Sequence, residues 1–281
     1  MQKLSLKKVF PFTWYFFLIF NLLPIQEYAY SEEVEISSVR NYEYNPIISI
    51  DEWKKLEPFF LPINHPTKTY LDQLFSNNRP ILSEKAMEKA GFSNNIIIRG
   101  PQKAVIGHHP KLKGYIIKTF LDIQPVQGEW IAWRSRILGA EAIRKCIEHH
   151  NFKEFRVPKK WIYPIPINST PPLEPIYYPK YFILVEEDMH LLSHKETKKT
   201  YRNKMTKKTL DHLYIVLSEV GLIDSVYADN IPFNKSGKIC FIDTEHFNKG
   251  PVKFERIKRY LSPSLQVYWQ HLIDCNGPLN K

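Results

Sequence analysis

The chain has 281 residues, 43% of them apolar, so it is long enough for one large domain or two small lobes with a real core. Its formal net charge of +10 favours acidic partners such as nucleotides, nucleic acid or an anionic membrane. Three widely separated cysteines exclude a disulfide framework and a paired-cysteine metal site.

Residues 1–31 have the pattern of a targeting segment. Three lysines precede an uncharged, largely apolar run over residues 9–25, and small residues follow from Ala29 to Ser31. The run is shorter than the ~20 residues that a membrane-spanning helix prefers. The pattern therefore favours a cleaved signal peptide, and hence export, over the alternative of an uncleaved membrane anchor formed by residues 9–25.

Residues 32–95 form a proline-punctuated extension that we expect to pack on the core domain. Short helices are predicted over residues 51–60 and 83–90. Ser83 is suited to be the N-cap of the second helix, and Gly91 lies just beyond its end. No catalytic pattern occurs in this extension.

The next region has a strand pattern, with candidates over residues 96–98, 104–107 and 114–121. In the third candidate, alternation places Ile116, Lys118 and Phe120 on one face. A lysine between two apolar neighbours needs an anionic partner, because an unpaired buried charge is costly. The alternative is an edge-strand lysine that reaches solvent.

Residues 129–150 form the clearest amphipathic helix, with Trp133 on its apolar face. At ~100° per residue, Glu141 lies at the rim of that face, where a carboxylate can reach Lys118 across a strand–helix interface. We therefore predict Glu141 as the partner of Lys118, with Glu129 as the alternative.

Two residues near the end of the same helix, Cys146 and His150, have the i, i+4 spacing of a metal-binding pair. The sequence offers no third ligand spaced with them. We therefore interpret them as part of a solvated helix end.

Residues 194–208 carry seven basic side chains against one acidic side chain, Glu196. This pattern indicates either a solvated helix face or a docking patch for an acidic protein or an anionic membrane. A single interleaved aromatic residue, Tyr201, argues against a stacking platform for nucleic acid. The basic residues are Lys195, Lys198, Lys199, Arg202, Lys204, Lys207 and Lys208.

A predicted helix then leads into the stretch with the strongest chemical pattern. Its acidic turn contains Asp224 and ends at Asn230, and a turn at residues 234–237 joins it to a short apolar strand over residues 238–242. That strand runs directly into Asp243, so a hairpin brings the two acidic turns together. Converging carboxylate and amide oxygens suit a Mg²⁺ ion that carries phosphates.

This stretch resembles the catalytic and metal-binding loops of the protein-kinase-like superfamily. Asn230 and Asp243 fit that pattern, 13 residues apart, and the strand around Lys118 resembles the family strand whose lysine holds nucleotide phosphates. The chain departs from the family in several places. The usual His-Arg is missing, Ser225 stands at the position of the catalytic aspartate with Asp224 one residue earlier, and Asp-Thr-Glu replaces Asp-Phe-Gly.

The resemblance covers residues 96–247 and implies an α+β, protein-kinase-like two-lobed fold. A small antiparallel-sheet N-lobe is expected over residues 96–188, and a reduced helical C-lobe over residues 189–281. Only 38 residues follow Asp243, which leaves no room for the large peptide-docking lobe of ordinary protein kinases.

By the same resemblance, the expected cofactors are ATP and Mg²⁺. Lys118, oriented by Glu141, would hold phosphates, Asn230 and Asp243 would hold the metal, and Asp224 would act as the base.

Three functions are compatible with these patterns. The first is an exported phosphotransferase that depends on ATP and Mg²⁺. The second is a pseudokinase, in which the same fold serves as a scaffold without catalysis. The third has no kinase ancestry and is a basic exported protein, without a nucleotide site, that binds an acidic partner.

Overall fold

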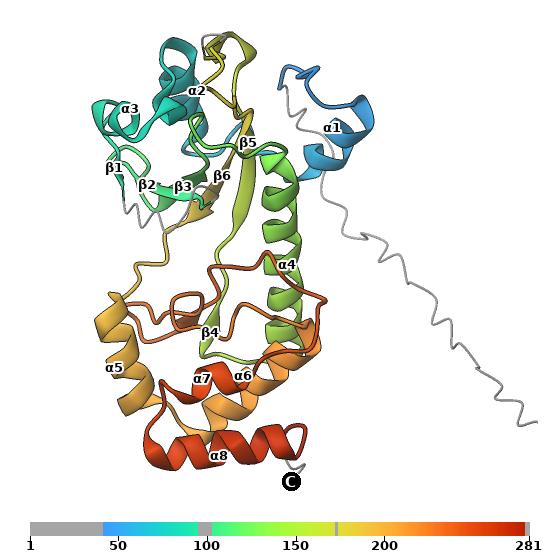
Figure 1. The fold of residues 1–281 in the computed structure, drawn as a ribbon, viewed down its shortest axis with the longest axis vertical. Helices are drawn as coiled ribbons and strands as arrows, with labels where there is room; N and C mark the ends of the chain where they lie inside the picture. Colours follow the sequence, from blue (N-terminus) through green and yellow to red (C-terminus); the bar gives the residue numbers. More distant parts are fainter. Residues whose placement is uncertain (1–41, 95–102, 172–173, 279–281) are drawn as a thin grey trace, which may run out of the picture. The chain divides into compact units, whose positions relative to one another are not determined.

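A computed structural model describes residues 42–94, 103–171 and 174–278 (Figure 1). The predicted targeting segment, the strand expected at residues 96–98 and most of the loop after it lie outside the described residues. Everything described belongs to one compact unit, residues 38–281. Among the residues that the structure describes, no helix combines the length and the apolar character needed to cross a bilayer.

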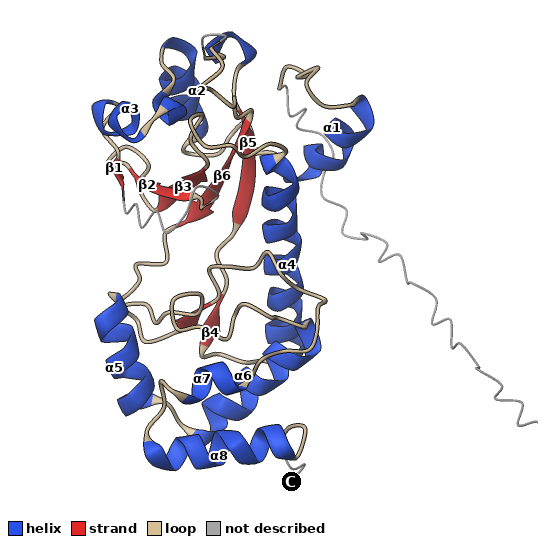
Figure 2. Cartoon of the chain, in the orientation of Figure 1, coloured by secondary structure: helices blue, strands red, loops and turns tan. Residues whose placement is uncertain are grey.

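A five-stranded antiparallel sheet, in the order β1-β2-β3-β6-β5, organises the first half of this unit (Figure 2). Its strands are β1 (Ser93–Asn94), β2 (Val105–His108), β3 (Tyr115–Thr119), β5 (Lys160–Pro164) and β6 (Phe182–Glu187). The register places Lys118 opposite Leu184 and Lys160 opposite Glu186. The α+β class and the antiparallel sheet expected from the sequence are confirmed.

The two faces of this sheet bury different side chains. One face packs on α2 (Lys68–Asn77) and α3 (Glu84–Lys89) through a core that includes Phe75, Met87 and Ile117. The other packs on the long helix α4 (Glu129–His149) and on α1 (Ile50–Leu56) through a core that includes Trp133 and Leu184. The residues before the sheet thus form part of both cores.

The second half is helical (Figure 1). Its core contains side chains from the C-terminal part of α4, Ile143 and Cys146. Its helices are α5 (His194–Lys204), α6 (Lys207–Val220), α7 (Glu255–Lys258) and α8 (Pro263–Asp274). Two short strands, β4 (Phe155–Arg156) and β7 (Ile239–Cys240), pair in parallel. α6 ends at Gly221, whose φ of 63° is the left-handed conformation expected of a glycine cap.

The predicted elements agree with the structure in type and differ at their ends. The helix expected over residues 51–60 stops at Leu56 and continues as a 3₁₀ turn, because Pro58 has no amide hydrogen for the α-helical ladder. The turn at residues 234–237 is confirmed, with the Asn234 side-chain oxygen accepting from the backbone N–H of Ser236 and Lys238 at 3.1 and 2.9 Å. Three 3₁₀ turns occur in the described residues, at Glu57–Phe59, Pro80–Leu82 and Ile167–Ser169.

Candidate functional site

The candidate site forms where the residues that follow β7 meet the five-stranded sheet. The backbone carbonyl of Ile242, immediately before Asp243, accepts hydrogen bonds from two lysines of the sheet. Lys118 Nζ of β3 donates at 3.1 Å and Lys160 Nζ of β5 at 3.0 Å. These contacts join segments more than 80 residues apart in the sequence.

Glu186 of β6 lies between the same two lysines and neutralises much of their charge. Its Oε2 atom is 2.9 Å from Lys118 Nζ and 3.0 Å from Lys160 Nζ, and Lys118 also donates to Oε1 at 3.1 Å. Burial raises the pKa of Glu186, but the attraction of the two ammonium groups outweighs it and holds the pKa below the usual value. Burial lowers the pKa of Lys160 to about 8.

The partner of Lys118 is therefore Glu186, and the prediction of Glu141 for this role is wrong. The antiparallel register makes Lys118 and Glu186 diagonal neighbours on one face of the sheet, within reach of a long side chain. The alternative, Glu129, is also wrong: it accepts from the backbone N–H groups of Tyr181 and Phe182 at 2.6 and 3.0 Å. Lys118 therefore finds its carboxylate partner on the adjacent strand and not on helix α4.

Helix α4 contributes a different residue to the site, Arg136. Its guanidinium donates to Asp243 Oδ1 at 2.8 Å and to Glu245 Oε2 at 2.6 Å. Backbone contacts reinforce this attachment, because Ser135 Oγ donates to the Glu245 carbonyl at 2.7 Å and Thr244 Oγ1 donates to the Arg136 carbonyl at 2.5 Å.

The approach of α4 to this loop depends on Gly139. A Cβ atom built at Gly139 would lie 1.9 Å from the carbonyl oxygen of Thr244, well inside van der Waals contact. The helix and the loop are therefore as close as a glycine allows, and the loop has little freedom to move toward the helix.

The electrostatics of Asp243 favour its ionised form. Burial raises the pKa of this carboxyl, but Arg136, Lys118, Lys160 and His246 together outweigh burial and hold the pKa below its usual value. The side chain of Asp243 is nevertheless 34% exposed. Asp243 is thus an ionised carboxylate that is surrounded by cationic side chains and is accessible to solvent.

The acidic turn lies directly beside this loop. Asn230 accepts a backbone hydrogen bond from Ile242 at 3.1 Å, and its side-chain nitrogen donates to the Asp224 carbonyl at 2.8 Å. Ser225 is buried and its hydroxyl donates to the Asp243 carbonyl at 3.3 Å. The Asp224 carboxylate is 40% exposed and lies 3.4 Å from His246 Nε2.

Four of the five predicted site residues therefore come together: Lys118, Asp224, Asn230 and Asp243. Three further residues, Arg136, Lys160 and Glu186, were not predicted as site residues. Lys160 had a weak signal, since it alternates with the apolar Ile162 in the same way that Lys118 alternates with Ile116. Nothing local distinguishes Arg136 from the other arginines of its helix.

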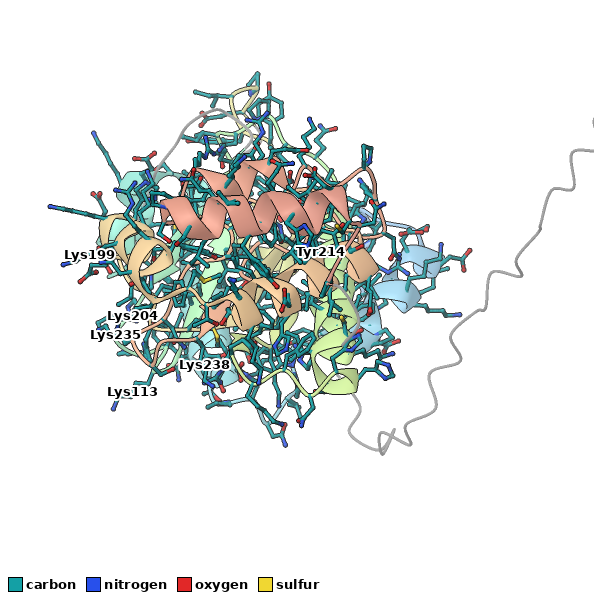
Figure 3. All side chains as sticks on the ribbon, turned by 90° about the horizontal axis from the view of Figure 1, so that it is seen from below. Lys113, Lys199, Lys204, Tyr214, Lys235 and Lys238 are labelled. Atoms are coloured by element: carbon teal, nitrogen blue, oxygen red, sulfur yellow. The ribbon has the colours of Figure 1, made fainter. Side chains whose placement is uncertain are left out.

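The basic residues 194–208 include helix α5, which lies next to a hollow. Exposed cations from α5 and from beyond α7 line it, and Asp229 of the acidic turn, paired with His194, is on its wall. Figure 3 shows Lys199 and Lys204 of α5 on the same side of the molecule as Lys235 and Lys238 of the hairpin. The cations at the hollow are Lys198, Lys199, Arg202 and Arg259.

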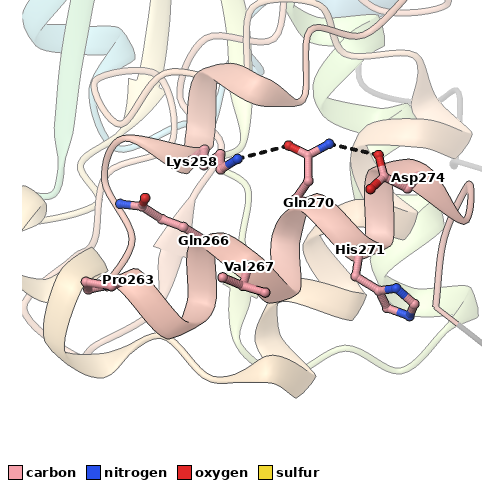
Figure 4. Close-up of a pocket in the computed structure, with 7 residues that line it drawn as sticks. All are labelled: Lys258, Pro263, Gln266, Val267, Gln270, His271 and Asp274. Atoms are coloured by element: carbon pink, nitrogen blue, oxygen red, sulfur yellow. Dashed lines mark hydrogen bonds between the residues drawn. The ribbon is translucent and has the colours of Figure 1, made fainter.

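A second hollow lies on the outer face of α8 (Figure 4). Three of its polar side chains bond to one another: Lys258 Nζ donates to Gln270 Oε1 at 3.0 Å, and Gln270 Nε2 donates to Asp274 Oδ1 at 2.8 Å. We assign no function to this hollow.

No protein-family model matches the sequence, and no curated protein matches it either.

Proposed function

We propose that the chain is a divergent protein-kinase-like phosphotransferase that uses ATP and Mg²⁺. One observation carries the proposal. Lys118 Nζ lies 3.1 Å from the carbonyl oxygen of Ile242, so the sheet lysine lies beside the residue that precedes Asp243. The resemblance implies that a phosphate-holding lysine lies beside a metal-binding aspartate. Lys118 and Asp243 are far apart in the sequence, so the fold brings them together.

The residues present have the donor chemistry that Mg²⁺ requires. Asp243 offers a partly exposed carboxylate, of which only Oδ1 is bonded to Arg136. The side-chain nitrogen of Asn230 donates to the Asp224 carbonyl. The side-chain oxygen of Asn230 is therefore the atom that would bind the metal. Bound Mg²⁺ would offset the negative charge of the nucleotide phosphates.

The protein side chains would then perform positioning and proton transfer. Lys118 would hold phosphate oxygens, with Glu186 in the orienting role. Asp224 would accept the proton of the acceptor hydroxyl. The hydroxyl oxygen would then bond to the terminal phosphorus of ATP, and the bond from that phosphorus to the leaving oxygen of ADP would break. The exposure of Asp224 and the burial of Ser225 favour Asp224 for this role.

Asp224→Ala is expected to abolish phosphate transfer and to leave nucleotide binding intact, because the proposed base does not hold the nucleotide. The loss should be about 10²-fold or more, the usual contribution of a positioned general base. The measurement compares ADP release with the ATP-induced rise in Tm. Asp211→Ala, an acidic-to-alanine change on α6, is the control. Unchanged turnover in Asp224→Ala would remove this residue from the mechanism.

A pseudokinase scaffold is the second candidate, and the contacts of Arg136 favour it. Arg136 binds both Asp243 and Glu245, so the proposed metal ligand already has a cationic partner. The backbone N–H groups of Glu187 and Asp188, where the family's interlobe hinge would meet adenine, already donate to Lys159 and Gly114 carbonyls at 3.0 and 2.8 Å. In this reading the fold persists without phosphate transfer.

A basic binding protein is the third candidate, favoured by the hollow beside α5. Replacing Lys198 and Arg202 with glutamate should weaken binding to vesicles containing anionic lipid, or to an acidic peptide, because the change reverses the local charge. The matched control replaces Lys85 and Lys89, two exposed lysines one turn apart on α3. Equal binding by both double variants, measured by co-sedimentation and by peptide titration, would exclude this surface.

An exported location is part of each of these proposals, and it rests on the pattern of residues 1–31.

A further inference from the structure

A cluster with metal-ligand chemistry lies at the far end of α4 from Arg136. Cys146 and His150 are one turn apart at the end of this helix, and Glu219 faces them from the last turn of α6. The Cys146 Sγ atom is 3.5 Å from Glu219 Oε2, and His150 Nε2 is 2.9 Å from each carboxylate oxygen. One donor atom from each residue lies within 4.8 Å of the other two.

We propose that Cys146, His150 and Glu219 form a Zn²⁺ site that fastens the end of α4 to the end of α6. The site is independent of the proposed phosphotransfer.

The separation of the sulfur and oxygen donors fits this ion. With Zn–S and Zn–O distances near 2.3 and 2.0 Å in a tetrahedron, the sulfur and oxygen ligands should be about 3.5 Å apart. The Sγ–Oε2 separation has this value. The imidazole and carboxylate would have to separate by a few tenths of an ångström, which the 50% exposed Glu219 side chain allows.

The kind and charge of the donors also favour Zn²⁺. A thiolate with an imidazole is a poor set for Mg²⁺ or Ca²⁺, which take oxygen ligands, and a good set for Zn²⁺. A thiolate and a carboxylate together carry two negative charges, so a bound divalent ion leaves the partly buried cluster neutral. Water would fill the fourth position on the exposed side.

The imidazole is held in place before any ion binds. The His150 ring stacks on Phe152 with centroids 5.0 Å apart and an interplanar angle of 11°. Phe152 is in turn stacked on His212 of α6 at 3.9 Å. Cys146 is only 9% exposed, so its sulfur is fixed by the core of the helical half.

The chain contains a matched control pair on α8. His271 and Cys275 have the same i, i+4 spacing, and Cys275 Sγ lies 3.6 Å from His271 Nδ1. Within the described residues, this pair belongs to no group of three potential ligands. The α8 pair therefore serves as a control that has the cysteine and histidine but lacks the third ligand.

The test is a titration of the reduced full chain with Co²⁺, followed by absorbance. One equivalent should give a thiolate-to-cobalt band in the near ultraviolet, with visible bands of tetrahedral Co²⁺, and Zn²⁺ should bleach them. Cys146→Ser should lose the near-ultraviolet band, and Cys275→Ser should keep it. Glu219→Gln, a change at a half-exposed side chain, should weaken Co²⁺ binding at least about tenfold.

A structural role also predicts a rise in Tm with Zn²⁺ that a chelator reverses and that Cys146→Ser abolishes. Circular dichroism of each variant establishes that it is folded. The proposal is overturned if no thiolate band appears, if Co²⁺ binds without one, or if the band survives in Cys146→Ser and disappears in Cys275→Ser.

Discussion

Gly139→Ala is expected to destabilise the protein by about 3 kcal/mol, the upper end of the usual cost of overpacking. The added Cβ would lie 1.9 Å from the carbonyl oxygen of Thr244, and a backbone atom cannot rotate away as a side chain can. Helix α4 and the loop that carries Asp243 must therefore separate. Urea unfolding measures the change in the free energy of unfolding.

The sign of this effect makes the prediction sharp. Alanine is the better helix former by about 1 kcal/mol, so helix propensity alone predicts stabilisation. Ile131→Ala is the control in the same helix, because this side chain is 65% exposed and its replacement should change stability by no more than about 0.5 kcal/mol. A Gly139→Ala variant more stable than the parent protein would contradict the close packing of α4 on the loop.

Glu186→Gln is expected to cost about 3–5 kcal/mol, the usual cost of leaving a buried charge without its partner. The glutamine amide would face two ammonium groups, from the 6% exposed side chain of Lys118 and the fully buried side chain of Lys160. Their remaining shared acceptor is the Ile242 carbonyl, which carries no full charge. Denaturant unfolding again supplies the measurement.

The neighbouring residue provides a matched control for this substitution. Glu187 follows Glu186 on β6 and accepts a hydrogen bond from the Lys159 backbone at 2.9 Å, in an exposed setting. Glu187→Gln keeps an acceptor there and should cost less than about 1 kcal/mol. Adding Lys160→Met to Glu186→Gln should recover part of the loss, since it removes one unpaired charge. Equal losses for the two glutamine variants would refute the buried ion pairs of Glu186 with Lys118 and Lys160.

Local pattern was sufficient to predict which face of β3 Lys118 lies on. Strand alternation has a period of two, so Ile116, Lys118 and Phe120 had to share a side once the strand existed. The turn at residues 234–237 was equally local, because asparagine and glycine supply the side-chain acceptor and the left-handed backbone that it uses. The hairpin that brings Asp224 near Asp243 followed from that turn.

The partner of Lys118 depended on information that local patterns lack. The pairing register between β3 and β6 joins segments more than 60 residues apart and alone makes Glu186 a neighbour. Glu141 was judged from its angle around α4, but the rotation of a helix over a sheet is set by packing. Here Gly139 and Arg136, on the turn before Glu141, face the loop.

The same limit applies to the proposed Zn²⁺ site. Cys146 and His150 were recognisable as a pair from their spacing, but no local pattern joins Glu219 to them. That residue lies 73 positions beyond Cys146 and reaches it only because α6 packs on α4. Ligands supplied by a second helix are visible only after the helices are assembled.

The most direct test of the proposed nucleotide site is the thermal unfolding of the full chain with ATP, with and without Mg²⁺, beside Asp243→Ala. ATP with Mg²⁺ at ~100 times its Kd should add about 2.7 kcal/mol of stability and raise Tm. The metal-dependent part should vanish in Asp243→Ala and persist in Asp229→Ala, an exposed aspartate of the same acidic turn. An absent shift with every metal tried, or an equal shift in Asp243→Ala, would contradict a nucleotide and Mg²⁺ site at this position.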